Sequence, residues 1–133
     1  MTKIYLIRHA EAEGNLYRVA HGHYDSLLTE RGYEQTRALE KRFSDVHIDA
    51  VYSSDLFRTL TTAKAIYVPK NLPLHTDAAF REVNLGVRED RPWQELTMES
   101  PEQMSFFNRH LEKWHVEGCE STEQVLARYL PAL

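Results

Sequence analysis

The sequence predicts an α/β sandwich with a mostly parallel sheet. Short apolar, β-branched stretches at residues 4–7 and 49–53 are typical of strands buried on both faces, and each precedes a segment of helical periodicity. Alternation of strand and helix favours a parallel sheet covered by helices. Proline and glycine are scattered singly along 133 residues, so we expect one domain over residues 1–133.

The first third of the chain predicts a strand, a loop and a helix. Ile4-Tyr5-Leu6-Ile7 is the expected first strand. Residues 10–28 have no sustained period and predict a long loop. Thr29 is the expected N-cap of a helix that reaches about Phe43 and has a charged outer face.

The middle of the chain repeats the order of strand and helix. Residues 49–53 predict a second buried strand, and Asp55 is the expected N-cap of the next helix, which reaches about Tyr67. Residues 74–80 carry a weaker strand pattern after several chain-breaking residues. Ligands bind beyond the carboxyl ends of parallel strands, so residues 8–9 and 53–58 are expected to share a site.

Capping boxes predict the last two helices. Ser100-Pro-Glu-Gln103 combines the box with proline at the first helical position, ahead of apolar residues at helical spacing. Ser121 and Gln124 repeat the box before a final helix that meets Pro131.

The composition excludes several classes of partner. The net charge of −4 gives no general attraction to nucleic acid or to an anionic membrane, so we expect neither partner. The apolar run before Arg8 is too short for a secretory signal or a membrane span. Cys119 is the single cysteine, which rules out an intrachain disulfide and a cysteine-based zinc cluster. The cytoplasm is the expected compartment.

Arg8 and His9 are the first candidates for chemistry, because they follow a predicted buried strand. A guanidinium there needs a partner, either a phosphate or a salt bridge with Glu11 or Glu13. An imidazole with a reference pKa of about 6.5 is largely neutral and nucleophilic near neutral pH. His9 is therefore a candidate nucleophile beside a candidate phosphate-binding arginine.

Arg58 and Glu82 are candidates at the ends of the next two predicted strands. Arg58, in the first turn of the helix after residues 49–53, would add a positive charge beside unpaired helix N–H groups. Glu82 could give a proton to a leaving oxygen if partial burial raises its pKa; a solvated surface glutamate is the alternative.

Four blocks of sequence resemble the histidine phosphatase superfamily, also called the phosphoglycerate-mutase-like family. They are LIRHAEAEGN at residues 6–15, DSLLTERGYEQ at 25–35, VYSSDLFRTLTTA at 51–63 and REVNLG at 81–86. The resemblance covers essentially the whole chain, and it implies a phosphoglycerate-mutase-like three-layer sandwich.

The resemblance also implies roles for particular residues. His9 would become phosphorylated, Arg8 and Arg58 would hold the phosphoryl oxygens, Asn15 would add a polar contact and Glu82 would be the general acid. Fixed arginines suit phosphoryl transfer, which depends mostly on positioning and electrostatic stabilisation. A phosphohistidine splits hydrolysis into two steps. The implied reaction needs no metal and no cofactor, and its substrate is a small phosphorylated molecule.

The chain departs from the family pattern at several positions. Ala10 and Ala12 stand where the family usually has glycine and a hydroxyl residue, and Asp90 replaces a frequent glycine. The sequence ends at Leu133, before the strand that carries the family's second catalytic histidine, so we expect a fold that is incomplete at its C-terminus and a truncated form of a longer phosphatase. Exposed strand edges would favour a homo-oligomer.

Three functions remain open on these grounds. The first is a phosphohydrolase of the histidine acid phosphatase or phosphoglycerate-mutase-like type, acting on a phosphate monoester through His9. The second is a phosphate-binding protein with weak or no turnover, and the third is a phosphoglycerate-mutase-type phosphotransferase. A metal site in His21-Gly-His23-Tyr-Asp25 is disfavoured, because Ser26 stands where a third histidine would complete the ligand run.

Overall fold

The computed structural model describes all residues, Met1–Leu133. It contains six α-helices, two strands and four single-turn 3₁₀-helices. The helices and strands in chain order are α1 (Glu13–Tyr17), α2 (Glu30–Phe43), β1 (Val51–Ser53), α3 (Phe57–Tyr67), β2 (Leu74–Thr76), α4 (Trp93–Glu99), α5 (Pro101–Arg109) and α6 (Thr122–Tyr129). The 3₁₀-helices are Ala78–Phe80, Gly86–Arg88, Leu111–Lys113 and Leu130–Ala132.

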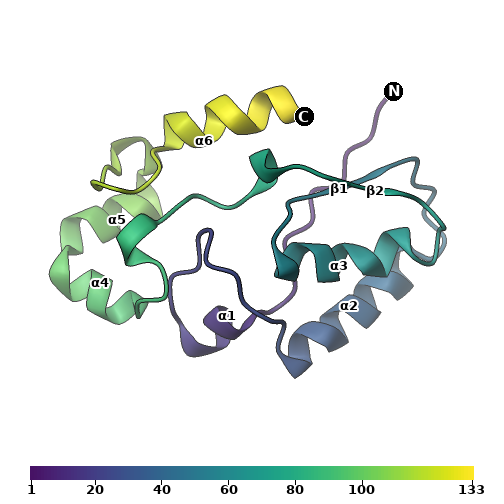
Figure 1. The fold of residues 1–133 in the computed structure, drawn as a ribbon, viewed down its shortest axis with the longest axis horizontal. Coiled ribbons are helices and arrows are strands. Elements are labelled where there is room, and N and C mark those ends of the chain that lie inside the picture. Colours follow the sequence, from purple (N-terminus) through teal and green to yellow (C-terminus); the bar gives the residue numbers. More distant parts are fainter.

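Helices lie on either side of a small parallel sheet (Figure 1). β1 pairs with β2 in parallel, with Val51 opposite Leu74 and Ser53 opposite Thr76. α2 and α3 pack together below the sheet, and α6 runs above the segment that follows β2. The predicted α/β class with a parallel sheet is confirmed.

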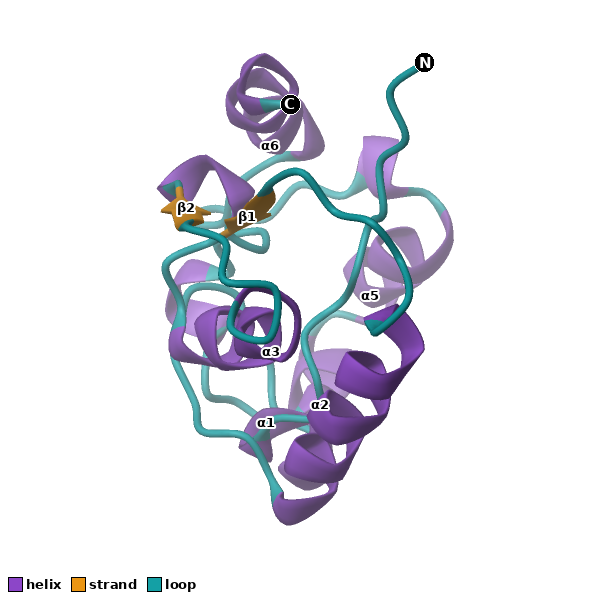
Figure 2. Ribbon diagram, turned by 90° about the vertical axis from the view of Figure 1, so that its right-hand side faces the viewer, coloured by secondary structure: helices purple, strands orange, loops and turns teal.

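The prediction of a first strand at residues 4–7 is wrong. This segment forms no strand, and the side chains of Ile4, Leu6 and Ile7 are exposed. Figure 2 shows the N-terminal segment running apart from β1, whose only partner is β2. An apolar β-branched run becomes a strand only where a neighbour completes its hydrogen bonds. Tyr5 alone is anchored, with its ring edge-on to Phe43 at 5.2 Å between centroids.

Two of the four predicted N-caps are confirmed. The Thr29 side chain accepts a hydrogen bond from the Gly32 amide and caps α2. Ser121 and Gln124 form the predicted capping box of α6.

Two predicted caps are wrong. Asp55 does not cap α3; its carboxylate instead accepts two hydrogen bonds from Arg81, at 2.5 and 2.6 Å. Ser100 precedes α5, but its hydroxyl is bonded to Arg88 and proline alone favours the helix start. Helix α4 was not predicted, because seven residues give too short a period to recognise.

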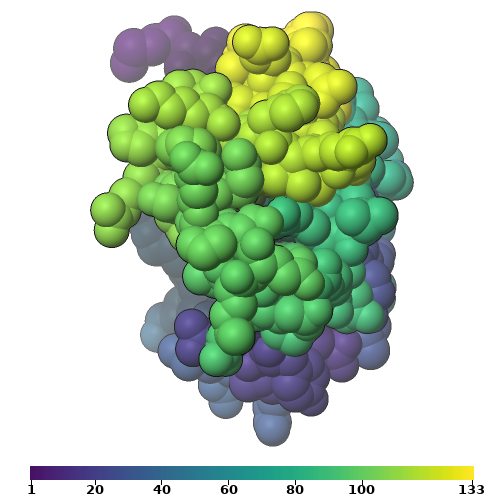
Figure 3. Space-filling view, turned by 90° about the vertical axis from the view of Figure 1, so that its left-hand side faces the viewer, coloured from purple at the N-terminus to yellow at the C-terminus, as the bar shows by residue number.

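The buried apolar side chains form separate clusters rather than one core. The largest, which joins α4 and α5 to two distant loops, comprises Ala20, Leu85, Leu96, Met104 and Trp114. Figure 3 shows the face over this cluster, where the green residues of α4 and α5 lie between the yellow C-terminal residues above and purple to blue residues from the first third of the chain below. A second cluster under the sheet comprises Phe43, Val51 and Ile66. No helix is long and apolar enough to cross a membrane.

Candidate active site

His9 presents one free ring nitrogen. Its Nδ1 lies 2.7 Å from the backbone oxygen of Ala10, and since a carbonyl can only accept, the proton is on Nδ1. This tautomer leaves a lone pair on Nε2. Burial lowers the pKa of His9, and the charges of Arg58 and Arg8 lower it further, while the bond to Ala10 and the charge of Glu82 oppose the shift. Neutral, nucleophilic imidazole is therefore the favoured form.

A chain of hydrogen bonds fixes the backbone beside His9 to α3. The buried Ala10 amide donates to the Thr62 hydroxyl at 2.9 Å, and that hydroxyl donates to the backbone oxygen of Arg58 at 2.7 Å. The candidate nucleophile is thus connected to the helix that carries the second predicted phosphate-binding residue, Arg58.

Arg58 is the most deeply buried charged side chain of the site, with 1% of its surface exposed. It is the second residue of α3, close to the position expected for it. Its terminal nitrogens donate to the backbone oxygens of Gly22 and Tyr24 at 2.7 and 2.8 Å. Its Nε is buried and has no partner, and the nearest carboxylate, that of Asp25, is 3.9 Å away. The guanidinium charge is therefore only partly compensated within the chain, and burial lowers its pKa.

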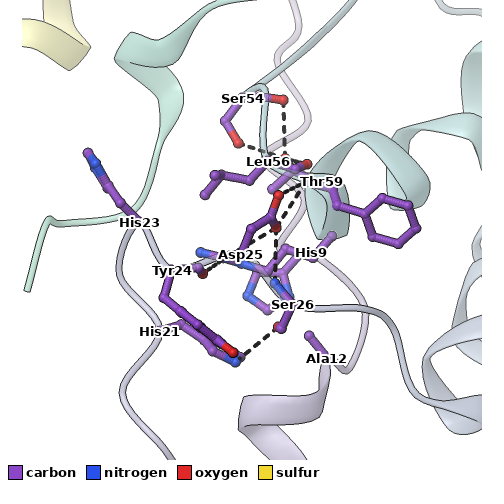
Figure 4. A network of polar contacts seen from close by, with 12 residues as sticks. His9, Ala12, His21, His23, Tyr24, Asp25, Ser26, Ser54, Leu56 and Thr59 are labelled. Atoms are coloured by element: carbon purple, nitrogen blue, oxygen red, sulfur yellow. Dashed lines mark hydrogen bonds and ion pairs between the residues drawn. The ribbon is translucent and has the colours of Figure 1, made fainter. Parts of the chain in front are cut away.

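Asp25, which the sequence analysis did not single out, caps α3 from a distance. Its two carboxylate oxygens accept hydrogen bonds of 3.0 and 2.8 Å from the Phe57 amide. In Figure 4 the Asp25 side chain extends from the loop toward the start of α3. The position of Asp25 in the second family block could have marked it as a candidate, but only the fold shows that it caps α3.

His21 is a second buried imidazole that the sequence analysis did not assign to the site. Its ring is edge-on to His9 with centroids 6.4 Å apart, and its Nε2 lies 3.2 Å from the Ser26 hydroxyl (Figure 4). Burial, followed by the charge of Arg58, lowers the pKa of His21 to about 4. The ring occupies the space where a Cβ on Gly14 would stand, 1.6 Å from Nε2. Glycine is required there by close packing.

Asn15 and Arg8 are both exposed. The Asn15 side-chain oxygen accepts from the Ala12 amide at 2.9 Å, which leaves the amide nitrogen without a bond within the chain. Arg8 was expected at the end of a buried strand, but it is exposed and forms no hydrogen bond or ion pair. The alternative salt bridge with Glu11 or Glu13 is absent as well.

Glu82 is close enough to influence His9 and Arg58 electrostatically, but it is exposed. The structure therefore favours the alternative of a solvated glutamate over partial burial, because Glu82 is the exposed residue of a segment, 81–85, that forms no helix or strand. Its Oε1 accepts from the Val83 amide at 2.9 Å.

The segment His21–Asp25 does not gather its side chains around a common point. His21 packs inward, Asp25 caps α3, and His23 Nε2 donates to the backbone oxygen of Glu82 at 2.9 Å. No group of three or more His, Cys, Asp or Glu side chains is placed to hold a metal ion. Residues 21–25 therefore contact the candidate nucleophile through His21 and the backbone of Glu82 through His23.

The model of the histidine phosphatase superfamily (branch 1) matches residues 4–133. The chain belongs to this superfamily. A protein from Yersinia pestis (strain Pestoides F) named "Probable phosphoglycerate mutase GpmB" is 41% identical over 123 residues, which are 92% of this chain and 52% of that protein. The chain thus spans about half the length of the curated relatives it matches.

Solved structures of the superfamily share the fold of this chain. YhfR from Bacillus stearothermophilus has a TM-score of 0.87 at 30% identity, covering 94% of this chain and 62% of that one. A mycobacterial glucosyl-3-phosphoglycerate phosphatase has a TM-score of 0.86 at 26% identity, covering 93% and 61%. The predicted membership and the phosphoglycerate-mutase-like fold are confirmed, and the chain spans about three fifths of the length of these solved chains.

Proposed function

We propose that this site hydrolyses a small phosphate monoester through a phosphohistidine on His9. The observation that carries the proposal is the pairing of a nucleophile with an anion site. His9 keeps Nε2 free because Nδ1 is bonded to Ala10, and the buried Arg58 beside it has a donor, Nε, without a partner. A phosphoryl group bound beside His9 would supply negative charge to a guanidinium that the chain itself compensates only in part.

In the first step, Nε2 of His9 attacks phosphorus and the bond from phosphorus to the leaving oxygen breaks. Glu82 gives its proton to that oxygen, and the product alcohol departs. In the second step, water attacks the phosphohistidine, Glu82 takes a proton from the water, and the P–N bond breaks to release inorganic phosphate. Arg58, Arg8 and Asn15 stabilise the charge on the phosphoryl oxygens in both steps.

A relative that is named as a phosphatase supports hydrolysis. The mycobacterial glucosyl-3-phosphoglycerate phosphatase that shares the fold has also been solved with inorganic phosphate, at 26% identity to this chain. The name of the Yersinia pestis relative instead favours a phosphoglycerate mutase. Both activities would use the phosphohistidine; they differ in whether water or an alcohol receives the phosphoryl group.

The test is release of inorganic phosphate from p-nitrophenyl phosphate, with His9→Ala as the control. Hydrolysis predicts turnover that His9→Ala abolishes. If the unaltered chain releases no more phosphate than His9→Ala, the hydrolase proposal fails. Binding of inorganic phosphate without turnover would support the phosphate-binding alternative. Transfer of labelled phosphoryl groups to added 3-phosphoglycerate in preference to water would support the mutase.

A further inference from the structure

The backbone around Glu82 is not fixed by the hydrogen bonds of a helix or a strand. Residues 81–85 belong to no helix or strand. No hydrogen bond from another backbone group reaches the amide or the carbonyl of Glu82, and its side chain bonds only to the adjacent Val83 amide. The position of this carboxyl group therefore depends on side chains from other parts of the chain.

Arg128, on α6, supplies most of these contacts. Its NH1 donates to the backbone oxygens of Ala79 and Arg81, at 2.6 and 2.8 Å. Its NH2 donates to the backbone oxygen of Glu82 at 2.9 Å. One guanidinium thus binds three carbonyls, two of them before the candidate acid in the chain and one at the acid itself.

Glu120 accepts hydrogen bonds from the Arg128 guanidinium and also contacts the backbone of Asn84, two residues after Glu82. The two carboxylate oxygens accept from Arg128 Nε and NH2 at 2.6 and 2.8 Å. One of these oxygens also accepts from the Asn84 amide at 2.9 Å, and the Glu120 amide donates to the Asn84 carbonyl at 2.8 Å. The bonds to Arg128 hold the pKa of Glu120 below its usual range, so the pair stays charged. Side-chain hydrogen bonds therefore fix the backbone before Glu82, at Arg81, and after it, at Asn84.

Helix α6 has few other contacts that would explain this pair. None of its residues is buried, and Leu126 within it and Leu130 just after it are exposed. Apart from an edge-on contact between Tyr129 and Phe80, the helix contacts residues 79–82 through Arg128. A fork that binds several carbonyls defines backbone geometry more closely than a single ion pair on a surface does.

We propose that Arg128 is a positioning residue for the general acid, which holds the Glu82 carboxyl within reach of the leaving oxygen. The inference rests on the proposed function, in which Glu82 gives up that proton. An acid acts only within hydrogen-bond distance of the oxygen it protonates, and a displacement of about 1 Å can lower the rate by ~100-fold. Loss of Arg128 would leave the Ala79 and Arg81 carbonyls without a donor and the Glu82 carbonyl with His23 alone, and would let the segment move.

The test compares two leaving groups. p-Nitrophenolate is a weak base that departs without a proton, whereas an alkoxide departs only when it is protonated. The rates on p-nitrophenyl phosphate and on ethyl phosphate are measured for the unaltered chain, Arg128→Ala, Arg128→Lys and Glu82→Gln. Arg37→Ala is the matched control, because Arg37 is an exposed helical arginine without a bonded partner.

Arg128→Ala is expected to lower kcat/KM, which reports only the steps up to departure of the alcohol, by about 10- to 100-fold on ethyl phosphate and by about twofold at most on p-nitrophenyl phosphate. Hydrolysis of the phosphohistidine is common to the two substrates, so slower hydrolysis would lower kcat on both. Arg128→Lys should recover part of the loss, because an ammonium keeps the charge but cannot bind all the carbonyls. Glu82→Gln should show the same dependence on the leaving group, and Arg37→Ala should show none.

Equal losses on the two substrates in Arg128→Ala and Arg128→Lys would overturn the inference, since a fold that is merely weakened affects both. No loss on either substrate would overturn it too. In both cases Glu82→Gln would still depend on the leaving group, so the proposed function would stand. If Glu82→Gln shows no such dependence, or the unaltered chain turns over neither substrate, the acid role itself fails and the inference with it.

Discussion

The two arginines that the sequence assigned to one phosphate differ sharply in how the chain holds them. Arg58 is buried, is bonded to two carbonyls and stands on α3, whose start is capped by Asp25. Arg8 is exposed and unbonded, on a segment that pairs with no strand. A charged group is organised in advance only where its backbone is fixed. The site therefore has a rigid half around Arg58 and a loose half around Arg8.

The largest expected difference follows from replacing each arginine in turn. Arg58→Gln should destabilise the fold by about 2 kcal/mol, because the carbonyls of Gly22 and Tyr24 lose charged donors, and should lower phosphatase turnover by about 100-fold or more. Arg8→Gln should change stability by less than about 0.5 kcal/mol. Urea unfolding and phosphate release measure both effects. Equal stability losses in the two variants would contradict the comparison.

A substitution at Gly14 tests the packing of the His21 ring, which lies against this glycine. A methyl group there would overlap the His21 ring, so Gly14→Ala should displace the ring and cost about 2 kcal/mol in the free energy of unfolding. The double variant with His21→Ala provides the control, because it empties the space. Its stability should be closer to that of His21→Ala alone than additivity predicts. Additive losses would show that the ring does not fill that space.

A smaller difference in stability is expected between variants of Asp25, which caps α3, and of Asp55, which does not. Asp25→Ala should destabilise the fold by about 1 kcal/mol, since the Phe57 amide at the start of the helix loses its acceptor. Asp55→Ala removes only a partly exposed pair with Arg81 and should cost less, between about 0 and 1 kcal/mol. Thermal unfolding of the two variants tests this order. The reverse order would restore Asp55 as the cap.

The smallest effect is a shift in the titration of His9. Burial and nearby arginines place its pKa below the ordinary value of 6.5, so the neutral ring should persist to lower pH than in an exposed histidine. In Arg58→Gln, one positive charge is removed and the pKa should rise. NMR titration of the ring, assigned by its loss in His9→Ala, measures both. A pKa at or above 6.5 in the unaltered chain would contradict the account.

Local signals were enough to predict a large part of the fold. The helix after Thr29, the strand at residues 49–53 and the capping box at Ser121 all depend on residues within a few positions of one another. The order of the family blocks gave the candidate site residues, and the electrostatic influence of Arg8, Arg58 and Glu82 on His9 shows that they lie in one region. Their roles stay predictions.

What could not be predicted depends on contacts between distant residues. The run at residues 4–7 carries the pattern of a strand, but pairing is a property of neighbours and not of the run. Asp25 and Asp55 are equally good caps by type, and only the path of the loop selects Asp25. His21 has no signature of its own, because its burial follows from the absence of a side chain at Gly14. Arg128 acts through carbonyls nearly fifty residues earlier in the chain.

The central claim is that His9 attacks through Nε2 beside the anion site at Arg58. Brief reaction with p-nitrophenyl phosphate, followed by quenching in base and mass spectrometry with ³¹P NMR, would locate the phosphoryl group. The account predicts phosphorylation of His9 at Nε2, because Nδ1 is occupied by its bond to Ala10. Phosphate on Nδ1, on another residue, or release of phosphate by a His9→Ala chain at the original rate would contradict it.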